Sequence, residues 1–136
     1  MKKLLLLLLP FTLLAQGPPN CVPTTIVINL DQYQGETSWD VKDSTGMVVA
    51  DGSGYYNQAD YAIVVEQACL PIGPLFFTIY DSYGDGLNGA LWGGLDGSYY
   101  LIQCNDTLVY GTDAAFGNDS IHVFVSDGCP PVMGCM

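Results

Sequence analysis

A loop rich in aspartate and glycine is the part of the chain best suited to chemistry. Asp81 and Asp85 lie on either side of Gly84, and Asn88 and Asp96 follow in the same stretch. Calcium in proteins takes about six to eight oxygen ligands from carboxylates, amides, main-chain carbonyls and water. Glycine lets the backbone curl so that its carbonyls face a bound ion. The loop therefore predicts a calcium site formed by Asp81, Asp85, Asn88 and Asp96.

The same loop has a second interpretation. Aspartate side chains readily accept hydrogen bonds from the main-chain N–H groups that follow them, and Asp-Gly turns of this kind are common in β proteins. An EF-hand is excluded, because Trp92 occupies the place of the bidentate glutamate and no helical pattern flanks the loop. A calcium site and a self-bonded turn cluster both remain open.

Aromatic residues gather near this loop as well. Tyr83 and Trp92 lie within it, and Tyr99 follows in the next apolar run. Aromatic rings beside carboxylates are typical of sugar-binding surfaces, where the ring packs on apolar C–H patches. Tyrosine is also an ordinary strand residue that is half buried in many sheets. A carbohydrate-binding surface of Tyr83, Trp92 and Tyr99 is the alternative hypothesis.

The chain lacks the residue combinations of common catalytic sites. His122 is the only histidine, and we expect the alternation of residues 121–125 to place it away from the core. One histidine without a free cysteine does not form a usual zinc site, and no GxSxG segment accompanies it. We therefore predict that the protein is not an enzyme.

Short apolar runs with a period of two surround the loop, separated by Gly, Asp, Asn and Pro. Thr37, Trp39 and Val41 are expected to face the core, opposite Ser38 and Asp40. The pattern predicts an all-β fold, a two-sheet antiparallel sandwich or jelly roll of about eight short strands. The predicted strands are residues 26–30, 37–42, 47–50, 61–66, 75–80, 98–103, 107–110 and 120–125.

The N-terminus has the pattern of a signal peptide, since Lys2 and Lys3 precede an apolar run that ends at Ala15. That run is shorter than the roughly 18–20 residues needed to span a bilayer. We expect export without membrane insertion after signal cleavage. The predicted organisation is a signal peptide at 1–15, a linker at 16–24, a β-sandwich module at 25–127, and a linker or the start of a truncated repeat at 128–136.

The exported part is strongly acidic. All 14 acidic residues lie after residue 15 against one basic residue, Lys42, so that 1 minus 14 gives a formal charge of −13. Nucleic acid and anionic membranes are excluded as partners, because binding phosphates requires clustered lysine and arginine. The carboxylates either form a solvated surface or are partly neutralised by divalent cations.

Five cysteines in an exported chain favour disulfides over thiolate metal sites. We expect Cys21 to pair with Cys129 and Cys69 with Cys104, which leaves Cys135 over. The other connectivities of these four residues remain open, because spacing alone does not select among them.

Four segments carry a resemblance to a known family: ETSWDVKDSTGMVVADG, FTIYDSYGDGLNG, DGSYYLI and AAFGNDS. Over about residues 26–126 they resemble a β-rich module repeated in exported proteins of bacteria that use the type IX secretion system. The resemblance implies an accessory domain of secreted metalloproteases or of large adhesion-type surface proteins, without catalytic activity of its own. Members often carry cysteines beside the loop, where this chain has Pro74-Leu75 and Leu87-Asn88.

These observations predict a secreted, extracellular or cell-surface protein. We expect a non-catalytic structural or adhesion-type interaction module with a calcium-binding loop, forming part of a larger surface protein. Its expected partners are other modules of a longer chain, a surface protein or a glycan. A carbohydrate-binding module and an accessory domain of a secreted protease are the alternatives.

Overall fold

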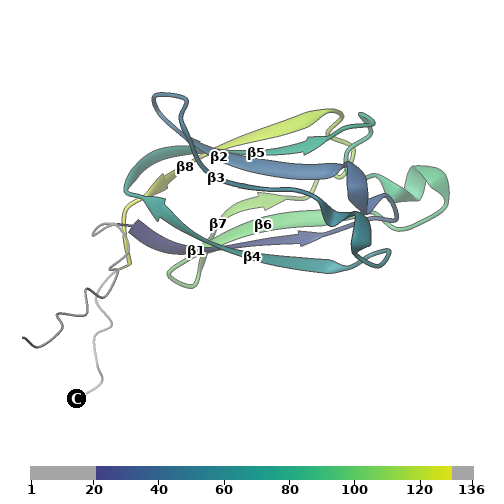
Figure 1. The fold of residues 1–136 in the computed structure, drawn as a ribbon, viewed down its shortest axis with the longest axis horizontal. Coiled ribbons are helices and arrows are strands. Elements are labelled where there is room, and N and C mark those ends of the chain that lie inside the picture. The colour runs from purple at the N-terminus through teal and green to yellow at the C-terminus, as the bar shows by residue number, and fades with distance from the viewer. Residues whose placement is uncertain (1–20, 130–136) are drawn as a thin grey trace, which may run out of the picture.

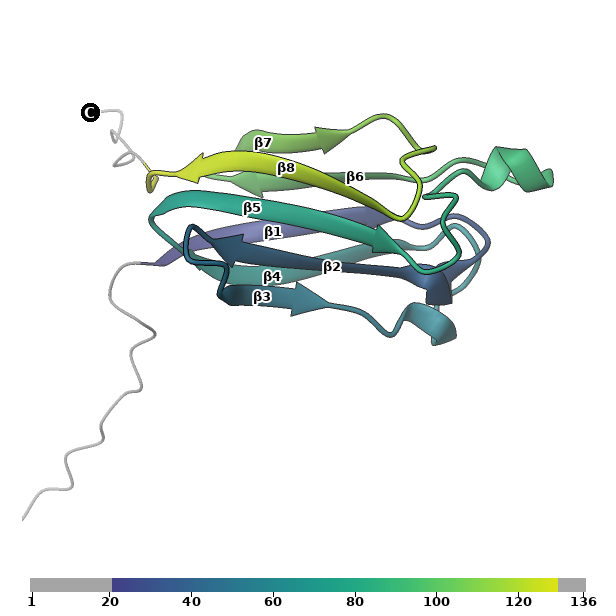
Figure 2. The same ribbon diagram turned by 90° about the horizontal axis from the view of Figure 1, so that it is seen from above.

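The computed structural model describes residues 21–129 as two antiparallel four-stranded sheets that pack face to face (Figure 1 and Figure 2). The strands are β1 (Cys21–Asn29), β2 (Thr37–Asp43), β3 (Val48–Gly52), β4 (Ile63–Pro71), β5 (Gly73–Asp81), β6 (Ser98–Gln103), β7 (Asp106–Gly111) and β8 (Asp119–Ser126). Three 3-10 turns lie between them, η1 (Gln34–Glu36), η2 (Tyr55–Asn57) and η3 (Gly89–Trp92). The predicted two-sheet sandwich of about eight strands is confirmed.

The order of strands is β4-β1-β6-β7 in one sheet and β3-β2-β5-β8 in the other. Only the β2–β3 and β6–β7 hairpins join neighbouring strands of one sheet, so every other connection crosses between the sheets. Among residues 21–129, no helix has the length and apolar character needed to cross a membrane.

An aromatic row links the two sheets through the core. Trp39 of β2 stacks on Phe77 of β5 with ring centroids 6.1 Å apart, and Phe77 lies 5.8 Å from Tyr99 of β6. All three side chains are buried, and the alternation of Thr37, Trp39 and Val41 toward the core is as predicted. Offset and tilted aromatic pairs of this kind add to the stability gained by burying apolar area.

β1 begins at Cys21, which is earlier than the predicted module boundary at residue 25. Pro18, Pro19 and Pro23 are typical of a linker, and proline also lacks the N–H that a sheet ladder uses. At Pro23, however, β1 is paired only with Cys69 of β4, and its pairing with β6 starts one residue later at Thr24. The N–H that Pro23 lacks is therefore not needed for the pairing of β1 with β6. The predicted signal peptide, residues 16–20 and residues 130–136 lie outside the described residues.

Two disulfides join Cys21 to Cys69 and Cys104 to Cys129. The four predicted cysteines are the ones bonded, but the expected pairing of Cys21 with Cys129 and Cys69 with Cys104 is wrong. β1 and β4 are antiparallel neighbours, so the start of β1 meets the end of β4. Cys104 lies in the β6–β7 turn, and its partner Cys129 follows the end of β8. Both bonds therefore lie at the same end of the sandwich.

The inner and outer faces of β8 are reversed relative to the prediction. Ile121, Val123 and Val125 are exposed, whereas His122 and Phe124 point toward the core. His122 Nε2 lies 2.7 Å from Tyr99 Oη, and burial lowers the pKa of the imidazole. Alternation could not choose between the faces, because both faces of this strand carry apolar residues.

Candidate functional site

The Asp/Gly loop follows β5 at the end of the sandwich away from the two disulfides (Figure 1). Asp81 is the last residue of β5 and is 3% exposed. One of its oxygens, Oδ2, accepts hydrogen bonds from the N–H groups of Gly84, Asp85 and Gly86 at 2.7, 2.7 and 2.9 Å. Asp81 thus does what the turn-cluster interpretation predicts, since its side chain fixes the loop backbone.

Main-chain hydrogen bonds hold the loop between two other segments. The N–H of Asp81 donates to the carbonyl of Asn118, and the N–H of Leu87 donates to that of Ala114. On the other side, the N–H of Ser82 donates to the carbonyl of Glu36 at 3.0 Å. Leu87, which belongs to the loop, is buried in the core. The loop is therefore anchored on both sides without a disulfide across it.

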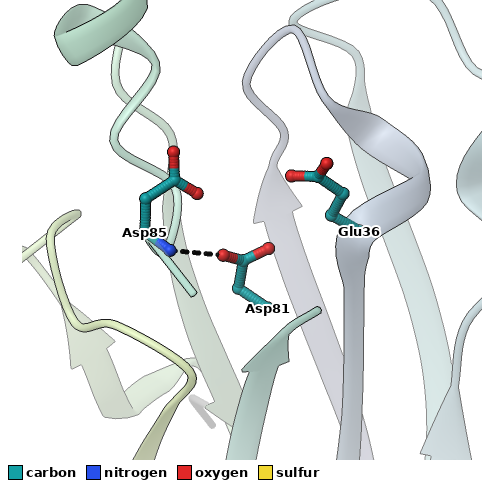
Figure 3. Close-up of side chains that lie close together, drawn as sticks. All are labelled: Glu36, Asp81 and Asp85. Carbon is teal, nitrogen blue, oxygen red and sulfur yellow. Dashed lines mark hydrogen bonds between the residues drawn. The ribbon is translucent and has the colours of Figure 1, made fainter. Parts of the chain in front are cut away.

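Three carboxylates converge at this anchored loop. Glu36, Asp81 and Asp85 each offer an oxygen, and these oxygens all lie within 4.8 Å of one another. Figure 3 shows Glu36, the last residue of η1, reaching toward the two aspartates, and one oxygen of Asp81 pointing toward Glu36. The structure thus joins two predicted metal ligands, Asp81 and Asp85, with a third carboxylate that sequence reasoning missed.

Glu36 precedes Thr37, and Thr37 pairs with Asp81 across β2 and β5. This register brings two residues that are distant in the chain to the same end of one sheet. The available signal was the ETSW segment, which contains Glu36 and belongs to the same resemblance as YDSYGDG.

Within residues 21–129, no ion pair joins the three clustered carboxylates to a positive charge. Burial, followed by the charges of Asp81, Asp85 and Asp31, raises the pKa of Glu36. The pKa of Asp31 is raised by burial and, less strongly, by the charges of Asp85 and Asp81, although the N–H of Tyr33 donates to its carboxylate.

Within residues 21–129 the single lysine or arginine is Lys42, whose Nζ lies 3.0 Å from Asp40 Oδ2. Its hydrogen bonds to Asp40 and Tyr80 raise its pKa. The lysine is therefore engaged by another acidic residue. Asp85 also has a buried oxygen, Oδ1, that makes no hydrogen bond in the described part of the chain.

A pocket of about 190 Å³ opens beside the carboxylates, lined by Tyr33, Glu36, Tyr83, Asp85 and Trp92. Trp92 Nε1 donates a hydrogen bond to Asp85 Oδ2. The rings of Tyr83 and Trp92 meet edge to face with centroids 6.0 Å apart. The pocket therefore has aromatic walls and two of the three clustered carboxylates.

The other predicted site residues lie elsewhere. Asp96 Oδ1 accepts the N–H of Ala90 at 2.9 Å and so fixes the η3 turn rather than joining the three carboxylates. Asn88 stands at the N-cap of η3, and its side chain makes no capping hydrogen bond there. Tyr99 is only 2% exposed, which contradicts its prediction as a surface contact for a sugar.

No protein-family model, curated protein or solved structure matches the chain. The function is therefore argued from the geometry and charge of the site.

Proposed function

We propose that this protein is a secreted, non-catalytic interaction module in which calcium, bound by Glu36, Asp81 and Asp85, holds one end of the sandwich in order. The observation that carries the proposal is the convergence of these three carboxylates within 4.8 Å. Two like charges about 4 Å apart repel by roughly 1 kcal/mol in bulk water and roughly 4 kcal/mol at the effective dielectric near a protein surface. A bound divalent cation converts this repulsion into attraction.

The type of ligand favours calcium over the other common metals. All three groups are hard oxygen donors, and the single histidine, His122, faces Tyr99 in the core rather than the loop. Zinc sites in proteins normally include histidine or cysteine. Magnesium demands near-ideal octahedral geometry, whereas calcium accepts irregular sites with mixed carboxylate, carbonyl and water ligands.

A non-catalytic role is supported by the surroundings of His122. Its Nε2 lies within hydrogen-bond distance of both Tyr99 Oη and Ser120 Oγ, at 2.7 and 3.2 Å. Ser120 lies on the same strand, and the pocket is lined by none of these three residues. The histidine that would act as a base therefore does not line the pocket beside the carboxylates.

An extracellular location is supported by the two disulfides and by the signal-peptide pattern at the N-terminus. In that setting, free calcium is high enough for sites with dissociation constants of roughly 10⁻⁴ to 10⁻³ M to be filled. We propose that the module belongs to a larger surface protein and keeps a partner-facing loop in one conformation.

Calcium titration of the secreted, oxidised chain tests the proposal. Calcium at about 100 times its dissociation constant should add about 2.7 kcal/mol to the free energy of unfolding. The test variant is Glu36→Gln combined with Asp85→Asn, because a change at Asp81 would also remove the bonds that fix the loop. The shift should disappear in this variant.

The matched control is Asp106→Asn, which removes an exposed charge at the other end of the β6–β7 pair. It should keep the calcium-dependent shift. An equal shift in the wild type and the double variant, or no shift with millimolar calcium, would overturn the proposal.

A further inference from the structure

The aromatic pocket and the three carboxylates form one continuous site. Glu36 and Asp85 belong to both, because they line the pocket and also approach Asp81 within 4.8 Å. The remaining walls are Tyr33, Tyr83 and Trp92, which are 41%, 65% and 50% exposed. A ligand in this pocket would therefore contact aromatic rings on its sides and the proposed calcium at its inner end.

We propose that this pocket binds a sugar ring of a neutral glycan, with a pair of neighbouring hydroxyls completing the coordination of calcium. The inference rests on the proposed function, since it requires calcium at Glu36, Asp81 and Asp85. Its own observation is the aromatic pocket that opens onto these carboxylates.

The coordination chemistry leaves room for ligand oxygens. Asp81 Oδ2 is occupied by three main-chain N–H groups, and Asp85 Oδ2 accepts the indole N–H of Trp92. The three carboxylates therefore have fewer free oxygens than the about six to eight that calcium takes. Hydroxyl groups are hard oxygen ligands of the same kind as water, so a pair of them can fill adjacent positions.

The shape and chemistry of the walls suit a sugar ring. A volume of about 190 Å³ is below the roughly 300 Å³ at which pockets for drug-sized ligands begin, so it fits one ring rather than a long chain. Aromatic faces pack against the apolar C–H patches of a sugar, while carboxylates accept its hydroxyl hydrogens.

The aromatic wall is already positioned. Trp92 is tied to Asp85 by its indole N–H and meets Tyr83 edge to face. A side chain that is fixed before binding loses less conformational entropy when the ligand arrives. Because of this contact, the position of the Trp92 ring depends on whether Asp85 binds an ion.

Charge selects a neutral ligand. Glu36 and Asp85 line the pocket, Asp81 lies beside them, and Lys42, the one lysine or arginine of residues 21–129, is paired with Asp40. A uronic acid or sialic acid would bring another negative charge into this region. A cationic peptide would be attracted by the carboxylates themselves, and calcium would compete with it. The two ligand classes therefore predict opposite effects of calcium.

Saturation-transfer NMR and calorimetry on the secreted chain test the inference with the methyl glycosides of mannose, glucose, galactose and fucose. These probes present neighbouring hydroxyls in different orientations. At least one should bind in calcium and lose at least tenfold in affinity in chelator. Trp92→Ala and Tyr83→Ala should each weaken binding at least tenfold while calcium still binds.

The matched control is Tyr110→Ala, because Tyr110 is 62% exposed on β7 and lies outside the pocket. It should leave sugar affinity unchanged. Calcium binding with no saturation transfer from any of the four glycosides overturns this inference and leaves the proposed function standing. Failure to bind calcium overturns both. Sugar binding that persists in chelator, or a lysine-rich peptide that binds better in chelator than any sugar binds in calcium, overturns the calcium-bridged glycan site.

Discussion

Thr37 of β2 pairs with Asp81 of β5, and this register places Glu36 beside the loop that follows Asp81. The pairing continues along both strands, with Trp39 opposite Ile79 and Val41 opposite Phe77. The buried sides of these strands fix the register, because a shift by one residue would expose the whole core face. The packing of the core therefore fixes where the main chain at Glu36 lies relative to the loop.

Glu36→Gln should change the stability of the protein in opposite directions with and without calcium. In chelator the substitution removes a carboxylate from a cluster of like charges, so the melting temperature should rise. In excess calcium it removes a ligand, so the melting temperature should fall below that of the wild type. Thermal unfolding of both proteins in the two buffers measures this crossing.

Glu66→Gln is a useful comparison for this prediction, because Glu66 is a partly buried glutamate that contacts Tyr55 rather than the loop. Its effect should be the same in both buffers. A Glu36→Gln protein that is less stable than the wild type by equal amounts with and without calcium would show that Glu36 acts only through packing.

The pH dependence of the calcium-free protein should reveal the same cluster. The pKa of Glu36 is raised from its ordinary value of 4.5 and that of Asp31 from 3.8, chiefly by burial. The folded protein therefore holds these protons more tightly than the unfolded chain. Their favourable contribution is fully present below the ordinary values and is lost as the pH rises through the folded-state pKa values.

The measurement is the difference in unfolding free energy between the wild type and Glu36→Gln in chelator, followed from pH 4 to pH 7. The wild type should lose stability relative to the variant as the pH rises. Asp43, whose pKa is lowered mainly by the Thr45 hydroxyl, contributes in the opposite sense, but it is common to both proteins and cancels in the difference. A flat difference would contradict the prediction.

The eight strands could be predicted because the signals for them are local. Alternation, β-branched residues and Asp/Gly turns act over a few residues, so runs such as 75–80 and 98–103 are readable without a partner. Which face of β8 is buried was not readable, because Ile121 and Val123 are as apolar as the core-facing Phe124. That choice depends on contacts between His122 and Tyr99 of the other sheet.

The site could be predicted only where its parts are adjacent in the chain. Asp81 and Asp85 were found because one loop carries both, but Asn88 and Asp96 were included for the same reason and belong to the η3 turn. Glu36 depends on the β2–β5 register, which no local pattern shows.

Removing either disulfide should reduce stability without abolishing calcium binding, because both bonds lie at the other end of the sandwich. Cys21→Ala with Cys69→Ala and Cys104→Ala with Cys129→Ala should each cost about 2–4 kcal/mol. The first pair closes the longer loop, with a sequence separation of 48 against 25, so its loss should cost about 0.6 kcal/mol more.

Denaturant unfolding gives these two losses, and calcium affinity is measured well below each melting temperature. Peptide mapping without reduction checks the connectivity itself. A peptide linking Cys21 to Cys129 would contradict the structure, and a large drop in calcium affinity in either variant would contradict the independence of the two ends.

Gly86→Ala should disturb the loop more than an ordinary glycine substitution at positive φ. Gly86 has φ +77°, and a Cβ there would lie 2.2 Å from the Ala114 carbonyl oxygen. The left-handed backbone alone costs of order 1 kcal/mol for alanine. The contact with Ala114 adds to this cost, because that main-chain oxygen is held by the N–H of Leu87.

The control is Gly46→Ala, at φ +86° with no atom within 4 Å of the added Cβ. Denaturant unfolding should show a larger loss for Gly86→Ala, and calcium titration should show reduced affinity for this variant alone, since the displaced loop carries Asp85. Equal losses in the two variants would mean that the contact between the loop and residues 112–118 does not hold the site in place.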